Sequence, residues 1–198
     1  MANNHSILIN PFDRLSDRKM ILIGLVAYFI ASIQAYLFSY AVEGLLHLRP
    51  VEGLPWYVGF ISHALNILVL ASFLWLCSKI FYRKIRWQDV AIVVMIAQVV
   101  NYVVALLMMN PFVRIPFDQI HQAVLAGDMT LTSVSPLDLT IAVAIAMISL
   151  ALLVYFFYLL VVGMKIAINA KRKVDAVWIV LVTLIVDVLL NISVKTIF

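Results

Sequence analysis

The sequence is poor in charge, in cysteine and in the residue patterns that build catalytic sites. Charged residues make up 12% of its 198 residues, about half of the fraction that is usual in soluble domains. Cys77 is the only cysteine, so an internal disulfide is excluded. His5, His47, His63 and His121 are scattered, and no metal-ligand spacing, Gly-rich phosphate loop or Gly-x-Ser-x-Gly elbow occurs. We therefore expect a protein that is not an enzyme, with no bound metal and no cofactor.

What the sequence has in excess is apolar surface. Hydrophobic residues make up 65% of the chain and gather in five long runs. A hydrocarbon core about 30 Å thick needs roughly twenty helical residues, and each run reaches about that length. We predict an all-α fold: a polytopic integral membrane protein with a five-helix transmembrane bundle. The predicted units are a cytoplasmic tail (1–19) and a membrane domain (20–198) with spans at about 20–41, 58–81, 90–109, 137–162 and 174–197.

Positive charge is concentrated in every other gap between the five apolar runs. Eleven of the fourteen Lys and Arg residues lie before the first run, or around the gaps between runs two and three and between runs four and five. Cytoplasmic connections are enriched in Lys and Arg, so this bias predicts an N-terminus inside and a C-terminus outside. Topology thus explains the net charge of +4, and no nucleic-acid partner is expected.

Polar side chains recur at similar depths in the predicted spans. Asp187 lies near the middle of the fifth span, where an Asp costs about 2.5–3.5 kcal/mol and needs a partner, a protonated state or water. Every span supplies at least one further polar residue: Gln34, Asn66, Gln98, Asn101, Ser149, Thr183 and Asn191. These side chains form either a hydrogen-bonded belt that fixes helix register or the wall of a cavity for a proton, ion or small solute. We favour the belt, because five spans make a small bundle and a single acid lies deep within it.

The two inner turns carry the densest positive charge. One turn holds Arg83, Lys84 and Arg86, and the other holds Lys171, Arg172 and Lys173. These residues predict one cytoplasmic patch. We favour contact with anionic lipid head groups at the inner face; the alternative is an acidic cytoplasmic protein partner. A homo- or hetero-oligomer is compatible with the sequence.

The longest connection, residues 110–136, predicts a short amphipathic helix. Pro116 is a suitable start and Gly127 a suitable end. One face of that helix would be apolar and would rest on the outer interface; its residues are Phe117, Ile120, Val124 and Leu125. Such a helix is either a lid or partner surface, or a packed cap on the bundle.

Two stretches carry a resemblance to a known family. Ile9-Asn10-Pro11-Phe12 resembles the Asn-Pro-Phe/Trp-like lead-in of bacterial members of the Yip (Ypt/Rab-interacting protein) membrane-domain family. The stretch 158–176 resembles that family's Leu-Val-x-Gly-Leu-Lys exit from the fourth span, its short basic turn and the Ala that opens the fifth. The Gly-Tyr pair and the proline of many members are missing from 97–102, and the long acidic N-terminal domain of eukaryotic members is missing too.

The resemblance implies a prokaryotic-type member with five spans, in a bacterial inner (cytoplasmic) membrane as a multi-pass protein. We expect a non-enzymatic protein that organises membrane or recruits partners through its cytoplasmic basic turns. The alternative is a small permease or channel that uses the intramembrane polar layer around Asp187.

Overall fold

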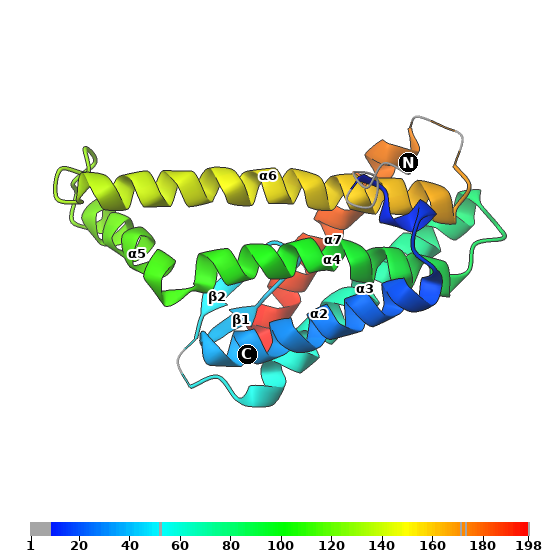
Figure 1. Cartoon of the computed structure of the whole chain (residues 1–198), viewed down its shortest axis with the longest axis horizontal. Coiled ribbons are helices and arrows are strands. Elements are labelled where there is room, and N and C mark those ends of the chain that lie inside the picture. The colour runs from blue at the N-terminus through cyan, green and yellow to red at the C-terminus, as the bar shows by residue number, and fades with distance from the viewer. Residues whose placement is uncertain (1–8, 52, 171, 173, 198) are drawn as a thin grey trace, which may run out of the picture.

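The computed structural model describes residues 9–51, 53–170, 172 and 174–197. Within them the chain forms six α-helices, one 3₁₀ helix and one two-stranded sheet. In chain order these elements are η1 (Pro11–Asp13), α2 (Asp17–Leu37), β1 (Tyr40–Val42), β2 (Leu48–Pro50), α3 (Trp56–Phe81), α4 (Trp87–Met109), α5 (Pro111–Leu125), α6 (Pro136–Ala167) and α7 (Asp175–Ile197) (Figure 1).

Five of the helices, α2, α3, α4, α6 and α7, are long and apolar enough to cross a membrane. The prediction of an all-α, polytopic membrane protein with a five-helix bundle is therefore confirmed. Much of the apolar surface of these helices stays exposed in the isolated chain, for example Leu22 and Ile30 on α2 and Val143 and Met147 on α6. Such a surface is stable against lipid tails and would be costly in water.

The boundaries of two predicted elements are wrong. The first helix ends at Leu37 rather than Ala41, because Ser39 takes a positive φ of 50° and the chain turns into β1. The outer helix begins at Pro111 rather than Pro116, which lies inside α5. The Asn110 side chain accepts a hydrogen bond from the Phe112 backbone N–H (3.0 Å), and this cap starts the helix early.

The predicted start of the fourth span is correct. The Ser135 side chain accepts a hydrogen bond from the Asp138 backbone N–H at 3.1 Å, with Pro136 in the first turn. The predicted fourth span ends at about 162 or a turn beyond, and α6 continues to Ala167. The helix is 32 residues long and runs through Gly163 without a break.

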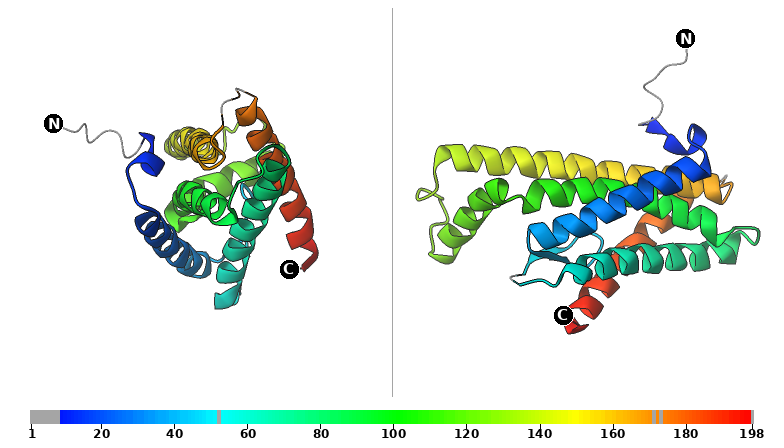
Figure 2. Two further views of the ribbon diagram at one scale, coloured as in Figure 1. Left: turned by 90° about the vertical axis from the view of Figure 1, so that its right-hand side faces the viewer. Right: turned by 60° about the horizontal axis from the view of Figure 1, so that its bottom comes forward.

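Helix α4 is the central element of the bundle. It packs against α2, α3, α5 and α6, and the end view in Figure 2 shows it surrounded by other helices. Helix α7 packs against α3 and α6, so the main core gathers side chains from α3, α4, α6 and α7. Leu70, Val94, Phe156 and Ile179 from these four helices are all fully buried.

Small residues let α2 and α3 approach closely. Ala31 and Ala35 of α2 are buried at the crossing, opposite Gly59 of α3. A Cβ at Gly59 would lie 2.7 Å from the backbone oxygen of Ser32 and 3.0 Å from the Ala35 Cβ. Close packing of this kind is a main source of helix association in lipid, where apolar burial supplies no preference.

Replacing Gly59 by valine tests this crossing. Because the Ser32 carbonyl belongs to the backbone, it cannot swing aside, and we expect a loss of about 1–3 kcal/mol, the usual cost of overpacking. The measurement is the thermal unfolding midpoint in detergent. Ala144→Val, at an exposed position of α6, is the matched control and should unfold with the wild type. Equal midpoints for the two variants would contradict the close approach.

Candidate functional site

The segment that connects α2 to α3 along the chain forms a β-hairpin, and the loop of this hairpin is buried in the helix bundle. Strands β1 and β2 pair antiparallel, with Ala41 opposite Arg49. The hairpin loop (residues 43–47) joins them and is closed by a hydrogen bond from the Glu43 N–H to the His47 carbonyl at 3.0 Å. Residues 43–45 are buried. Non-helical backbone at this depth must find hydrogen-bond partners, because the surrounding apolar groups supply none.

Asp187 of α7 supplies one of these partners. Its carboxylate accepts a hydrogen bond from the Leu46 backbone N–H at 3.0 Å, and the His47 Nδ1 lies 3.2 Å from the other carboxylate oxygen. A Cβ at Gly44 would lie 2.7 Å from the Asp187 Oδ1, so a glycine permits this approach. Asp187 is 4% exposed, so it is buried beneath the loop.

Side-chain amides of α3 and α4 hold the loop from the other side. The Asn66 Nδ2 donates to the Gly44 carbonyl at 2.9 Å. The Asn101 Nδ2 donates to the Leu45 carbonyl at 3.2 Å and to the Gln98 Oε1 at 3.1 Å. The intramembrane polar layer is therefore organised around a buried loop, which the sequence did not reveal.

The other predicted members of the layer lie apart from the loop bonds. Thr183 is buried, but its hydroxyl donates to the Ile179 carbonyl of its own helix at 2.8 Å. Asn191 is half-buried on the next turn of α7 beyond Asp187. Gln34 is buried on α2, and its Nε2 has no hydrogen-bond partner among the described residues. Ser149 is buried on α6 and lines a cavity.

That cavity has a volume of about 320 Å³ and lies against the hairpin loop. The polar side chains in its wall come from three helices: His63, Asn66, Gln98, Asn101, Tyr102 and Ser149. Among the described residues, the wall contains no Asp, Glu, Lys or Arg. Asp187 is not part of it. The layer thus divides into an acid that anchors the loop and an uncharged cavity.

His63 and Tyr102 are cavity residues that the sequence reasoning missed. Their rings meet edge to face, with centroids 4.8 Å apart, and both side chains are buried. Helical spacing was an available signal. His63 precedes Asn66 by three residues and Tyr102 follows Gln98 by four, so each lies on the same helix face as a predicted polar residue.

The hairpin also contains an ion pair of its own. The Arg49 guanidinium contacts the buried Glu43 carboxylate across the hairpin. Tyr40, in the first strand, is fully buried, and burial raises the pKa of its phenol well above the usual range. The ion pair holds the second strand against the first residue of the loop.

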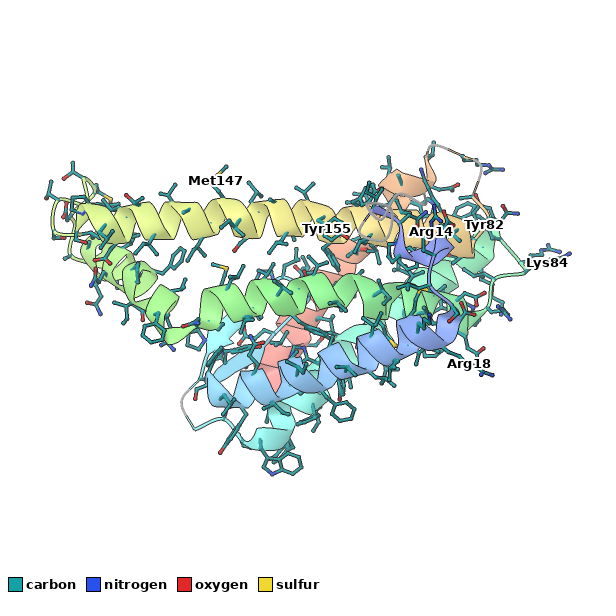
Figure 3. The ribbon with its side chains drawn as sticks, viewed as in Figure 1. Arg14, Arg18, Tyr82, Lys84, Met147 and Tyr155 are labelled. Atoms are coloured by element: carbon teal, nitrogen blue, oxygen red, sulfur yellow. The ribbon has the colours of Figure 1, made fainter. Side chains whose placement is uncertain are left out.

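The two basic turns meet at one end of the bundle. The Tyr82 hydroxyl, in the turn before α4, donates to the Asp175 carboxylate at the start of α7, at 2.7 Å. This bond raises the pKa of Tyr82. The Trp178 Nε1 also donates to Asp175, at 3.1 Å. Figure 3 shows Arg14, Arg18, Tyr82 and Lys84 at this same end.

The predicted basic residues differ in their pairing. Arg83, Lys84 and Arg172 are exposed. Arg86 makes two hydrogen bonds to the Asp89 carboxylate, at 3.0 and 2.9 Å, which raise the pKa of its guanidinium and neutralise its charge locally. Lys171 and Lys173 lie outside the described residues. Within the described part of the chain, no three His, Cys, Asp or Glu side chains lie close enough to hold a metal ion.

Two substitutions at Asp187 test its role as an anchor of the loop. In Asp187→Leu the N–H of half-buried Leu46 loses its acceptor, and we expect a loss of about 1–3 kcal/mol. Asp187→Asn keeps a carbonyl oxygen for that N–H and should lose distinctly less. Thermal unfolding in detergent measures both, with Val188→Leu on the exposed side of α7 as the control. If leucine were as stable as asparagine, the anchor role would be wrong.

Comparison of the chain with known protein families, curated proteins and solved structures finds no match. The resemblance to the Yip family therefore rests on the short motifs of the sequence. What the chain does has to be inferred from its own residues: a buried loop held by amides and one acid, a neutral cavity beside it, and a cationic end.

Proposed function

We propose that the protein is a non-enzymatic integral membrane protein that organises membrane through its basic turns at the cytoplasmic face. The supporting observation is an imbalance in ion pairing between the two ends of the bundle. At the hairpin and α5 end, Arg49 contacts Glu43 and Arg114 contacts Asp118. At the other end Arg86 contacts Asp89, but Arg83 and Lys84 are exposed, and neither of these two makes an ion pair with a described residue.

Unpaired cations at a span end have a physical consequence. An anionic leaflet attracts each nearby Lys or Arg with about 1 kcal/mol. Arg14, Arg18 and Lys84 lie at one end of the bundle (Figure 3), so their attractions act on one patch of membrane. The paired cations at the opposite end are already neutralised by carboxylates and would attract a leaflet less.

An acidic cytoplasmic protein would be attracted by the same charges. We favour lipid, because the cations stand directly at the ends of spanning helices, within reach of head groups. The motif resemblance to the Yip family, with its expected prokaryotic-type location in an inner membrane, agrees with this function. Recruitment of an acidic partner by the same charges is the alternative, and a homo- or hetero-oligomer would fit either function.

The alternative function, a small permease or channel, was expected to use Asp187. In the structure this carboxylate is bonded to the Leu46 N–H and lies next to His47, beneath the hairpin loop. It is outside the cavity wall. These contacts favour a structural role for Asp187, so we do not propose conduction through it.

The orientation is open to a direct test in intact cells. In a Cys77→Ala background, single cysteines replace Lys84, in the turn before α4, and Gln119, in α5. We expect an impermeant maleimide to label the cysteine at 119 in intact cells and the cysteine at 84 only after permeabilisation, because the cationic end faces the cytoplasm. Labelling of position 84 from outside would reverse the orientation, and labelling of both from one side would contradict the crossing by α4.

Two double variants test the proposal that the cationic end binds anionic lipid. Each removes two positive charges, one variant at the cationic end and the other at the hairpin and α5 end. Arg83→Gln with Lys84→Gln removes unpaired cations, and Arg49→Gln with Arg114→Gln removes paired ones. The measurement is the enrichment of anionic lipid around the reconstituted protein in mixed vesicles, by native mass spectrometry. We expect the first pair to reduce it by up to about thirtyfold, since each charge contributes about 1 kcal/mol, and the second pair to reduce it less.

The salt dependence and the partner alternative give independent checks. The difference between the variants should shrink as ionic strength rises, because exposed charges are screened. If both pairs behave alike, the unpaired cations do not bind lipid. If the first pair keeps its lipid but loses a co-purifying acidic protein, the charges recruit a protein instead.

A further inference from the structure

The cavity beside the hairpin loop holds an unusual density of unpaired polar atoms. Four side-chain atoms of its wall residues are buried and have no hydrogen-bond partner in the described part of the chain: Asn66 Oδ1, Gln98 Nε2, Tyr102 Oη and Ser149 Oγ. Each of the four residues is at most 8% exposed. Leaving one buried donor or acceptor unpaired costs about 1–3 kcal/mol, so four around one cavity indicate that something else completes them.

The chemistry of the wall restricts the occupant. An amide N–H₂, two hydroxyls and an amide oxygen offer both donors and acceptors. No charged side chain among the described residues lines the cavity, so an ionic ligand would stay uncompensated. The wall thus favours a neutral occupant that has both hydrogen-bond donors and acceptors.

The size of the cavity and the character of its rim restrict the occupant further. A volume of about 320 Å³ is at the lower end of small-ligand sites. Leu150 of α6 lines the cavity and is also 54% exposed, on a helix whose Met147 points away from the bundle (Figure 3). The rim is thus continuous with lipid-facing surface, which favours entry from the bilayer.

We propose that this cavity binds the head group of a neutral lipid of the diacylglycerol type, whose acyl chains remain between the helices and the bilayer. Gln98, Tyr102 and Ser149 donate to its ester carbonyls, and Asn66 accepts from its hydroxyl. This inference goes beyond the cationic end, because it concerns an uncharged ligand in a different part of the protein.

Photolabelling of the full chain tests the proposal. The probe is a diacylglycerol with a diazirine in one acyl chain, in nanodiscs, and the comparison probe is the phosphatidic acid with the same tag. We expect the neutral probe to label α4 and α6 in the wild type about tenfold more than in Ala146→Phe, which adds a ring at the exposed rim of the cavity wall. Ala144→Phe, the same change at another exposed position of α6 that is not part of the wall, should label like the wild type.

A milder variant guards against misfolding of Ala146→Phe. The double change Tyr102→Phe with Ser149→Ala removes two hydroxyls that have no hydrogen-bond partner among the described residues. We expect unchanged or higher thermal stability without lipid, and weaker labelling by the neutral probe. A loss of stability without lipid would show that the hydroxyls serve the fold, and it would overturn their role in binding.

Two further outcomes would overturn the proposal. In one, both probes label all variants equally, so the cavity does not select a neutral head group. In the other, water alone fills it: about ten molecules fit at roughly 30 Å³ each, and hydroxyl-radical footprinting would modify the wall equally with and without the neutral lipid. Protection of the wall by the lipid is the result that supports binding.

Discussion

The arrangement depends on one constraint: irregular backbone inside an apolar bundle must have its hydrogen bonds completed by side chains. The hairpin loop meets this condition through Asp187, Asn66 and Asn101, which bond to backbone atoms of residues 44–46. Because these three side chains come from α7, α3 and α4, one loop links three helices. The loop also forms a wall of the adjacent cavity through Leu45 and Leu46.

The long apolar helices could be predicted because the thickness of a bilayer sets their length. The hairpin could not, since Ala41–Leu46 is short and mostly apolar and continues the first run in composition. Only the positive φ of Ser39 and the later pairing of Ala41 with Arg49 separate it from the helix. A left-handed serine and a contact between strands leave no periodic signal in a single sequence.

The sequence predicts how far along each span the polar residues of the candidate site lie. It does not predict their hydrogen-bond partners. Asn66, Gln98, Asn101 and Asp187 stand at matching distances from the span ends, so their convergence follows from helix geometry. Asn66, Asn101 and Asp187 bond to backbone groups of a loop more than 20 residues away along the chain, whereas Gln98 accepts from the Asn101 side chain. Tertiary packing decides which polar residues bond to the loop and which line the cavity. A single sequence carries no signal for that difference.

The length of α6 has a consequence for the surroundings of the protein. Its 32 residues extend about 48 Å at 1.5 Å per residue, against a hydrocarbon core of about 30 Å. A straight rod of this size must lean, thicken the lipid around it or project from the surface with α5 attached. The energy of each response changes with bilayer thickness, so the protein is matched to some membranes better than to others, independently of their charge.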